Sequence, residues 1–168
     1  HNLKQAAKTM NFLTENKIEQ YADLLSRIEE ITTASEQTGD SLKEVEKRLS
    51  DMALLIKNVT TYQKTKPLYE VYRKARNKEK YRAEHERGII LHEAAAKALK
   101  AAQIGGKLPS VPVLQAEYEK LQAQKESLYA DYGKLKKQVA KYDVIKRNID
   151  SILQSEKQPE RERQTERG

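Results

Sequence analysis

Apolar residues recur along this chain at alternating steps of three and four, which is the spacing that one face of an α-helix requires. All six seam positions between residues 42 and 59 are apolar: Leu42, Val45, Leu49, Met52, Ile56 and Val59. A second stripe, of apolar and aromatic residues, runs from Leu114 to Leu153. No segment shows the strict apolar–polar alternation of a strand. The pattern therefore predicts a chain that is all-α.

Residues that break helices divide the pattern into four predicted helices, over 2–36, 41–63, 67–103 and 111–154. Gly39 is suited to a left-handed cap at the end of the first helix.

Three further signals refine these boundaries. Ser41 and Glu44 have the spacing of a capping box and would open the second helix. Pro67 disfavours helical geometry at the preceding residue, although a single helix kinked at Pro67 is the alternative. A change of phase in the third stripe predicts a bend near Asn77.

Four helices joined by short breaks pack most simply as antiparallel neighbours. We therefore expect an elongated antiparallel helical bundle, or a coiled-coil hairpin, of about four helices in a single domain over residues 1–154. The composition agrees, because hydrophobic residues make up 38% and charged residues 34%, too little apolar material for a thick core. The last segment, 155–168, has no aliphatic residue and is expected to be a disordered charged tail.

Candidate catalytic chemistry is sparse. The chain has no cysteine, so thiolate nucleophiles and cysteine-based metal sites are excluded. His85 and His92 are seven residues apart, about 10 Å along a helix, which is too far for both to bind one metal ion. Gly105 and Gly106 lack the spacing of a phosphate-binding loop. We therefore expect no catalytic residue, no metal site and no cofactor in this chain.

Charge is distributed unevenly, and this gives the main functional signal. Residues 57–87 hold ten basic and four acidic side chains, with tyrosines interleaved. Such a face can bind a polyanion, because Lys and Arg displace counterions from phosphates and exposed Tyr can stack on unpaired bases. The predicted nucleic-acid contacts are Lys64, Lys66, Arg73, Lys74, Arg76, Lys78, Lys80, Arg82, Tyr69 and Tyr72. A solvated surface, or a docking site for an acidic protein, is the alternative interpretation of the same charges.

Membrane insertion is not expected. The longest aliphatic run, Ile89-Ile90-Leu91, is far shorter than the roughly 20 residues that cross a bilayer. Together with the absence of cysteine, this predicts a soluble, cytoplasmic protein.

Several stretches, taken in order, resemble a known protein region. They are AKTMNFLTEN at 7–16, YQKTKPLY at 62–69, YRAEHE at 81–86, ILH at 90–92, LPS at 108–110 and LQAEY at 114–118. In this order they look like the helical region C-terminal to the nuclease domain in relaxase/mobilisation nucleases of conjugative and mobilisable elements of Gram-positive bacteria. The resemblance covers about Leu3 to Leu153.

The resemblance implies a role in DNA transfer without catalysis by this chain. In that family a nucleophile, often Tyr, cleaves one DNA strand beside a metal held by a His-rich motif. This sequence has no His-x-His cluster and no Tyr that matches the nucleophile position, so no catalytic residue is carried over.

The implied role is that of a non-catalytic accessory domain that contacts transferred DNA, with single strands preferred, or engages a coupling or secretion-system protein. The rival hypothesis is a coiled-coil interaction or dimerisation module without DNA contact, in which a homodimer forms or the Tyr-rich seam of the last helix docks a partner.

Overall fold

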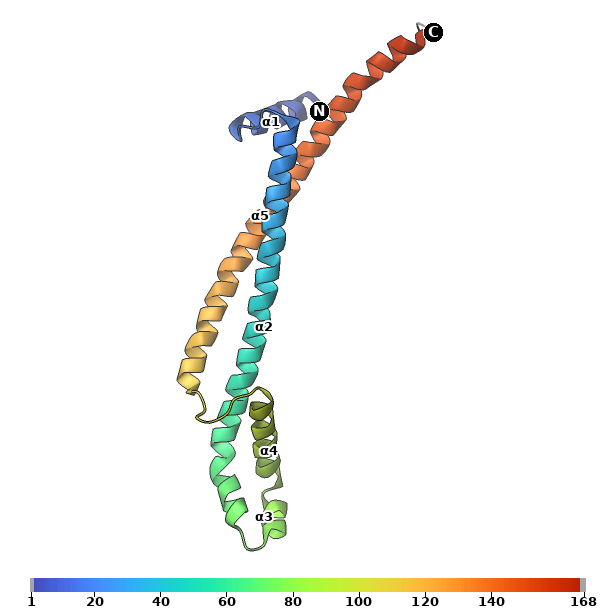
Figure 1. The fold of residues 1–168 in the computed structure, drawn as a ribbon. Helices are drawn as coiled ribbons and strands as arrows, with labels where there is room; N and C mark the ends of the chain where they lie inside the picture. Colours follow the sequence, from blue (N-terminus) through green and yellow to red (C-terminus); the bar gives the residue numbers. More distant parts are fainter. Residues whose placement is uncertain (1, 167–168) are drawn as a thin grey trace. The chain divides into compact units, whose positions relative to one another are not determined.

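The computed structural model describes residues 2–166, and it describes side chains from Leu3 to Glu156. This part of the chain is all-α and contains no strand. Its five helices, shown in Figure 1, are α1 (Asn2–Glu15), α2 (Tyr21–Lys74), α3 (Lys78–Glu84), α4 (Glu86–Ala101) and α5 (Val111–Glu166). The all-α helical-bundle prediction is confirmed. The chain divides into two compact units where the sequence predicted one domain: unit 1 holds the residues up to Ser41 and from Leu128 onward, and unit 2 holds Leu42–Ser127.

In unit 1, the first part of α2 pairs with the later part of α5. The hydroxyl of Tyr21 donates a hydrogen bond of 2.6 Å to Asp150, and Gly39 packs against the ring of Tyr132. Residue numbers rise along one helix as they fall along the other, so the pair is antiparallel. Helix α1 closes the core of this unit, which is formed by Phe12, Ile18, Leu24, Tyr142 and Ile145.

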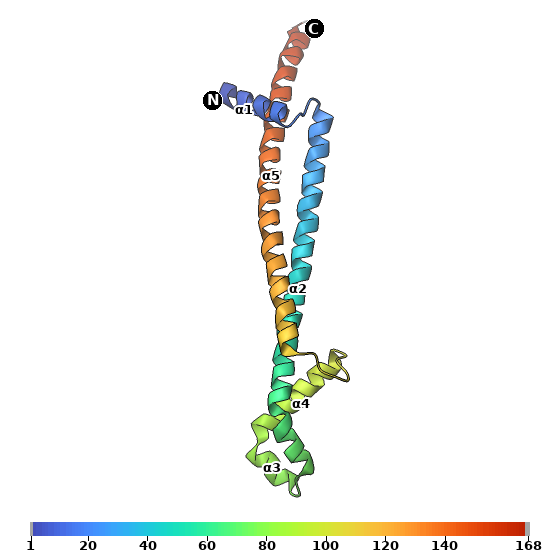
Figure 2. The same cartoon turned by 90° about the vertical axis from the view of Figure 1, so that its left-hand side faces the viewer.

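In unit 2, the later part of α2 pairs with the start of α5 in the same antiparallel sense. Lys125 Nζ lies 3.9 Å from Glu46 Oε1, an exposed ion pair that reports the register. Val59, Leu99 and Leu114 form the buried cluster, so α2, α4 and α5 each contribute one residue to it. Helix α4 lies beside the end of α2 in both Figure 1 and Figure 2.

Two predicted helix boundaries are wrong, because α2 continues through both. At Gly39, a Cβ would lie only 3.2 Å from Cε2 of Tyr132, so the glycine serves close packing between helices and not a cap. Nearby, Thr38 Oγ1 donates to the carbonyl of Ala34, as a hydroxyl inside a helix does. Pro67 also lies inside α2, which agrees with the continuous-helix alternative.

A turn that the sequence analysis missed separates α1 from α2. Lys17 has a positive φ of 56°, and the N–H of Ile18 donates to the carbonyl of Leu13. This is the Schellman arrangement, with Lys17 in place of the usual glycine. Ile18 is buried in the unit 1 core beside Leu13, and this apolar contact typically accompanies the motif.

Two other expectations concern helix ends. The bend near Asn77 is confirmed: α2 ends at Lys74, and the side chain of Asn77 caps α3 by accepting from the N–H of Lys80. The prediction of a disordered tail over 155–168 is wrong as far as Glu166, because α5 extends to that residue. Glu, Gln, Lys and Arg, which favour the helix, dominate this segment, and Pro159 is the helix-breaking residue within it. Arg167 and Gly168 lie outside the described residues.

Candidate nucleic-acid interface

The predicted contact residues all lie in unit 2, on the last three turns of α2, in the turn that follows it and on α3. This turn spans residues 75–77, and the short helix α3 and then α4 follow it (Figure 2). Helix α4 packs closely on α2, because a Cβ at Gly88 would lie 2.6 Å from Cδ2 of Leu68. The absence of a side chain at Gly88 therefore permits this close approach of the two helices.

A stack of three rings joins α4 to α2. His92 is 4% exposed and lies between Tyr62 and Tyr69, with ring centroids 4.6 Å and 4.3 Å away. Its Nδ1 lies 2.8 Å from Thr65 Oγ1, which itself donates to the carbonyl of Thr61. The hydroxyl proton of Thr65 is thereby used, so this network assigns the proton of His92 to Nδ1. Burial lowers the pKa of His92, and the nearby carboxylate of Glu93 opposes this shift.

The ring packing continues toward the turn. Tyr72 stacks on Tyr81 at 6.4 Å, and Tyr81 contacts His85 at 4.3 Å. We call the six residues of this packing the aromatic cluster: Tyr62, Tyr69, Tyr72, Tyr81, His85 and His92. Tyr69 and Tyr72, which were predicted to stack on a base, are half-buried and already packed against other rings of the cluster.

Arg82 joins the aromatic cluster to α4. Its guanidinium lies 2.8 Å from a carboxylate oxygen of Glu93 and donates a longer bond of 3.4 Å to the hydroxyl of Tyr72. The hydrogen bond to Glu93 raises the pKa of Arg82. The sequence pattern gave no signal for this pair, because its two residues belong to different helices. Because Arg82 is already paired with the carboxylate of Glu93, it differs from the other predicted cations.

The remaining seven predicted cations are exposed. We call them the tip cations: Lys64, Lys66, Arg73, Lys74, Arg76, Lys78 and Lys80. Among the described residues, none of the seven has an acidic side chain within ion-pair distance. Arg73 and Lys74 occupy the last turn of α2, where the helix dipole favours positive charge. The tip cations are thus free to meet a negatively charged ligand.

No protein-family model, curated protein or solved structure matches the chain. Over the described residues, no group of three or more His, Cys, Asp or Glu side chains is arranged to hold a metal ion. Over the same residues, no helix is both long enough and apolar enough to cross a bilayer.

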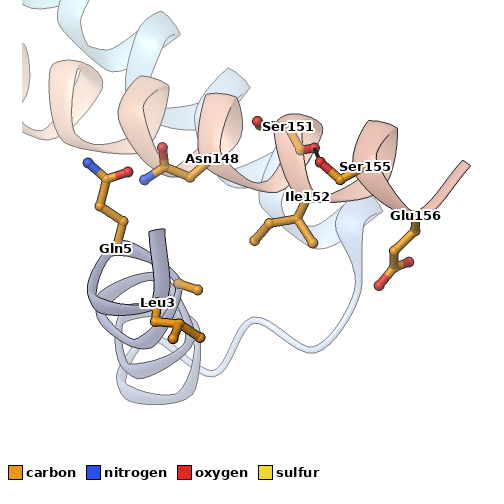
Figure 3. Close-up of a pocket in the computed structure, with 8 residues that line it drawn as sticks. Leu3, Gln5, Asn148, Ser151, Ile152, Ser155 and Glu156 are labelled. Atoms are coloured by element: carbon orange, nitrogen blue, oxygen red, sulfur yellow. Dashed lines mark hydrogen bonds between the residues drawn. The ribbon is translucent and has the colours of Figure 1, made fainter. Parts of the chain in front are cut away.

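A groove of about 500 Å³ lies in unit 1, between α1 and the later part of α5. Figure 3 shows its lining, with Leu3 and Gln5 on one side and Asn148, Ser151, Ile152, Ser155 and Glu156 on the other. The hydroxyl of Ser155 donates to the backbone carbonyl of Ser151, a bond within the helix. The lining offers one carboxylate and amide groups but no paired nucleophile and base, so it supports no reaction that we can derive.

Proposed function

We propose that this chain is a non-catalytic, nucleic-acid-binding accessory domain of a conjugative DNA relaxase, and that the tip cations contact DNA phosphates. The single observation that carries the proposal is the exposure of all seven cations between residues 64 and 80, at the end of α2, in the turn after it and on α3, without acidic partners among the described residues. The relaxase assignment rests on the resemblance of the stretches between residues 7 and 118. Under this assignment, the tip cations contact DNA while it is being transferred.

The physical basis is counterion release. Each Lys or Arg that neutralises a phosphate releases condensed ions, so affinity falls steeply as salt rises. The aromatic cluster supports the same proposal indirectly, because it fixes α3 and α4 against α2 and so holds the cations on an ordered framework. Arg82 serves this framework through Glu93, so we expect it to contribute less to phosphate binding than the tip cations.

Fluorescence anisotropy with single- and double-stranded oligonucleotides, at about 50 and 200 mM salt, tests the proposal. Contact with roughly five phosphates on a duplex should cost between two and three orders of magnitude in affinity over this range. The variant R73E/K74E/R76E should flatten the salt slope by about three and weaken binding at least tenfold at low salt.

The matched control is K43E/K47E/K120E, which changes the charge equally at three exposed lysines elsewhere in unit 2. This control should bind nearly as well as the native chain. Equal losses in the two variants would show an effect of net charge alone and would contradict a site at the tip. No binding by the native chain at low salt would refute DNA contact altogether.

A further inference from the structure

Helix α4 carries apolar residues on two faces, and only one of them is buried. The inner face consists of Ile89, His92, Ala95 and Leu99, all buried within unit 2. On the opposite side, Ile90 is 48% exposed and Leu91 is 44% exposed. Ala94 and Ala101 are also exposed, and Ala98 is half-buried. We call Ile90, Leu91, Ala94, Ala98 and Ala101 the outer face of α4.

The outer face is a continuous stripe. At 100° per residue, positions 90, 94, 98 and 101 fall within about 80° of one another, and Leu91 lies beside them. From Ile90 to Ala101 the stripe extends about 16 Å along the helix axis. Three of its five side chains are alanines, so another helix could pack with its axis only about 8–10 Å away.

The free charges beside this stripe are mainly basic. Arg87, Lys97 and Lys100 are all exposed. At 100° per residue, Arg87 lies on the outer face itself, Lys97 lies at its edge, and Lys100 lies about 80° further round the helix from Ile90. Of the two acids on the helix, Glu93 is paired with Arg82, which leaves Glu86. A ligand helix with acidic residues along its edges would therefore complement the outer face, whereas a second copy of α4 would bring like charges together.

We propose that the outer face of α4 docks an acidic amphipathic helix from another protein. Its apolar residues cover Ile90 and Leu91, and its carboxylates meet Arg87, Lys97 and Lys100. This is a protein-binding site separate from the tip cations, and it does not depend on DNA binding at the tip. It is also distinct from the Tyr-rich seam of the last helix, now α5, which the rival hypothesis treated as a docking surface. In that seam Tyr142 is buried, and Tyr118 and Tyr132 are half-buried.

Fluorescence anisotropy with two synthetic 21-residue peptides tests the site. One peptide has Leu and Ala on a single helical face and Glu elsewhere, and the other has the same composition in scrambled order. At about 100 mM salt, the amphipathic peptide should bind the native chain about tenfold more tightly than the scrambled one. I90Q/L91Q should remove this preference, while L54Q, which changes an exposed leucine on α2, should retain it.

Charge is tested separately with K97E/K100E, which should weaken binding of the amphipathic peptide by a similar factor and leave the helix content in circular dichroism unchanged. Four results would overturn the proposal. The first three are equal binding of the two peptides, equal binding by I90Q/L91Q and the native chain, and concentration-dependent dimerisation that I90Q/L91Q abolishes. Loss of oligonucleotide binding in I90Q/L91Q would show instead that DNA occupies the outer face, and would also overturn it.

Discussion

The two units hold their helices together by different means. In unit 1 the core is apolar: Leu24 is fully buried, and Phe12 meets Tyr142 edge-on at 5.0 Å. At the end of α2 in unit 2, the aromatic cluster takes this place, with a buried histidine between two tyrosines and an Arg82–Glu93 ion pair beside them. The stability of an apolar core depends on the shape and volume of its side chains. The stability of the aromatic cluster depends also on the protonation states of its hydrogen-bonding groups.

This difference suggests a division of roles. The aromatic cluster positions charged side chains at a surface, and its own stability should respond to pH. The unit 1 core contains no histidine, carboxylate or amine side chain. The two clusters should therefore respond differently to truncation and to acid.

Truncation of the unit 1 core should have the largest effect. Leu24→Ala removes a fully buried side chain and leaves a cavity, so the free energy of unfolding should fall by about 2–5 kcal/mol. Urea denaturation followed by circular dichroism measures this loss. The adjacent control, Leu25→Ala, truncates a side chain that is 40% exposed and should cost much less. Equal losses would mean that Leu24 is not in a close-packed core.

Acidification should distinguish the aromatic cluster from the unit 1 core. Burial lowers the pKa of His92 in the folded chain, so the unfolded chain binds a proton more readily. The contribution of neutral His92 to stability is therefore complete above its unfolded pKa of about 6.5, and it is lost as the pH falls below that value. Lys66 reinforces the shift and Glu93 opposes it, and Glu93 is itself paired with Arg82.

Urea denaturation of the native chain and of His92→Phe, at pH 7.5, 6.5 and 5.5, measures this dependence. The phenylalanine retains a ring between Tyr62 and Tyr69 but binds no proton, so its stability should decline less between pH 6.5 and 5.5. Leu24→Ala should keep the native pH dependence, because its truncation lies in unit 1. Parallel pH profiles for the native chain and His92→Phe would refute the role of His92.

The sequence predicted the helical fold because the spacing of apolar residues within a helix is a local pattern, and it persists along these helices. It misplaced the boundaries at Gly39 and Pro67, where tertiary packing and a long continuous helix outweigh local breaking signals. It also predicted that the tip cations contact nucleic acid, and the structure shows that they are exposed, as charged side chains usually are. It did not anticipate that Tyr69 would stack on His92, or that Arg82 would pair with Glu93. Such contacts depend on how α4 lies against α2, which helical periodicity does not encode.

The smallest expected effect concerns a feature that the two units share. Helices α1 and α4 both end in a Schellman arrangement with a non-glycine residue at positive φ, Lys17 at 56° and Gln103 at 61°. A side chain in the left-handed region costs about 1–2 kcal/mol, and the greater freedom of glycine in the unfolded chain offsets part of the gain from replacing it. Lys17→Gly and Gln103→Gly should therefore each stabilise the chain, by about 0.5–1 kcal/mol in urea denaturation. Ala102→Gly is the matched control: with φ of −77° at this position, glycine relieves no strain and should destabilise. A loss of stability in Gln103→Gly as well would show that its backbone imposes no strain on the helix end.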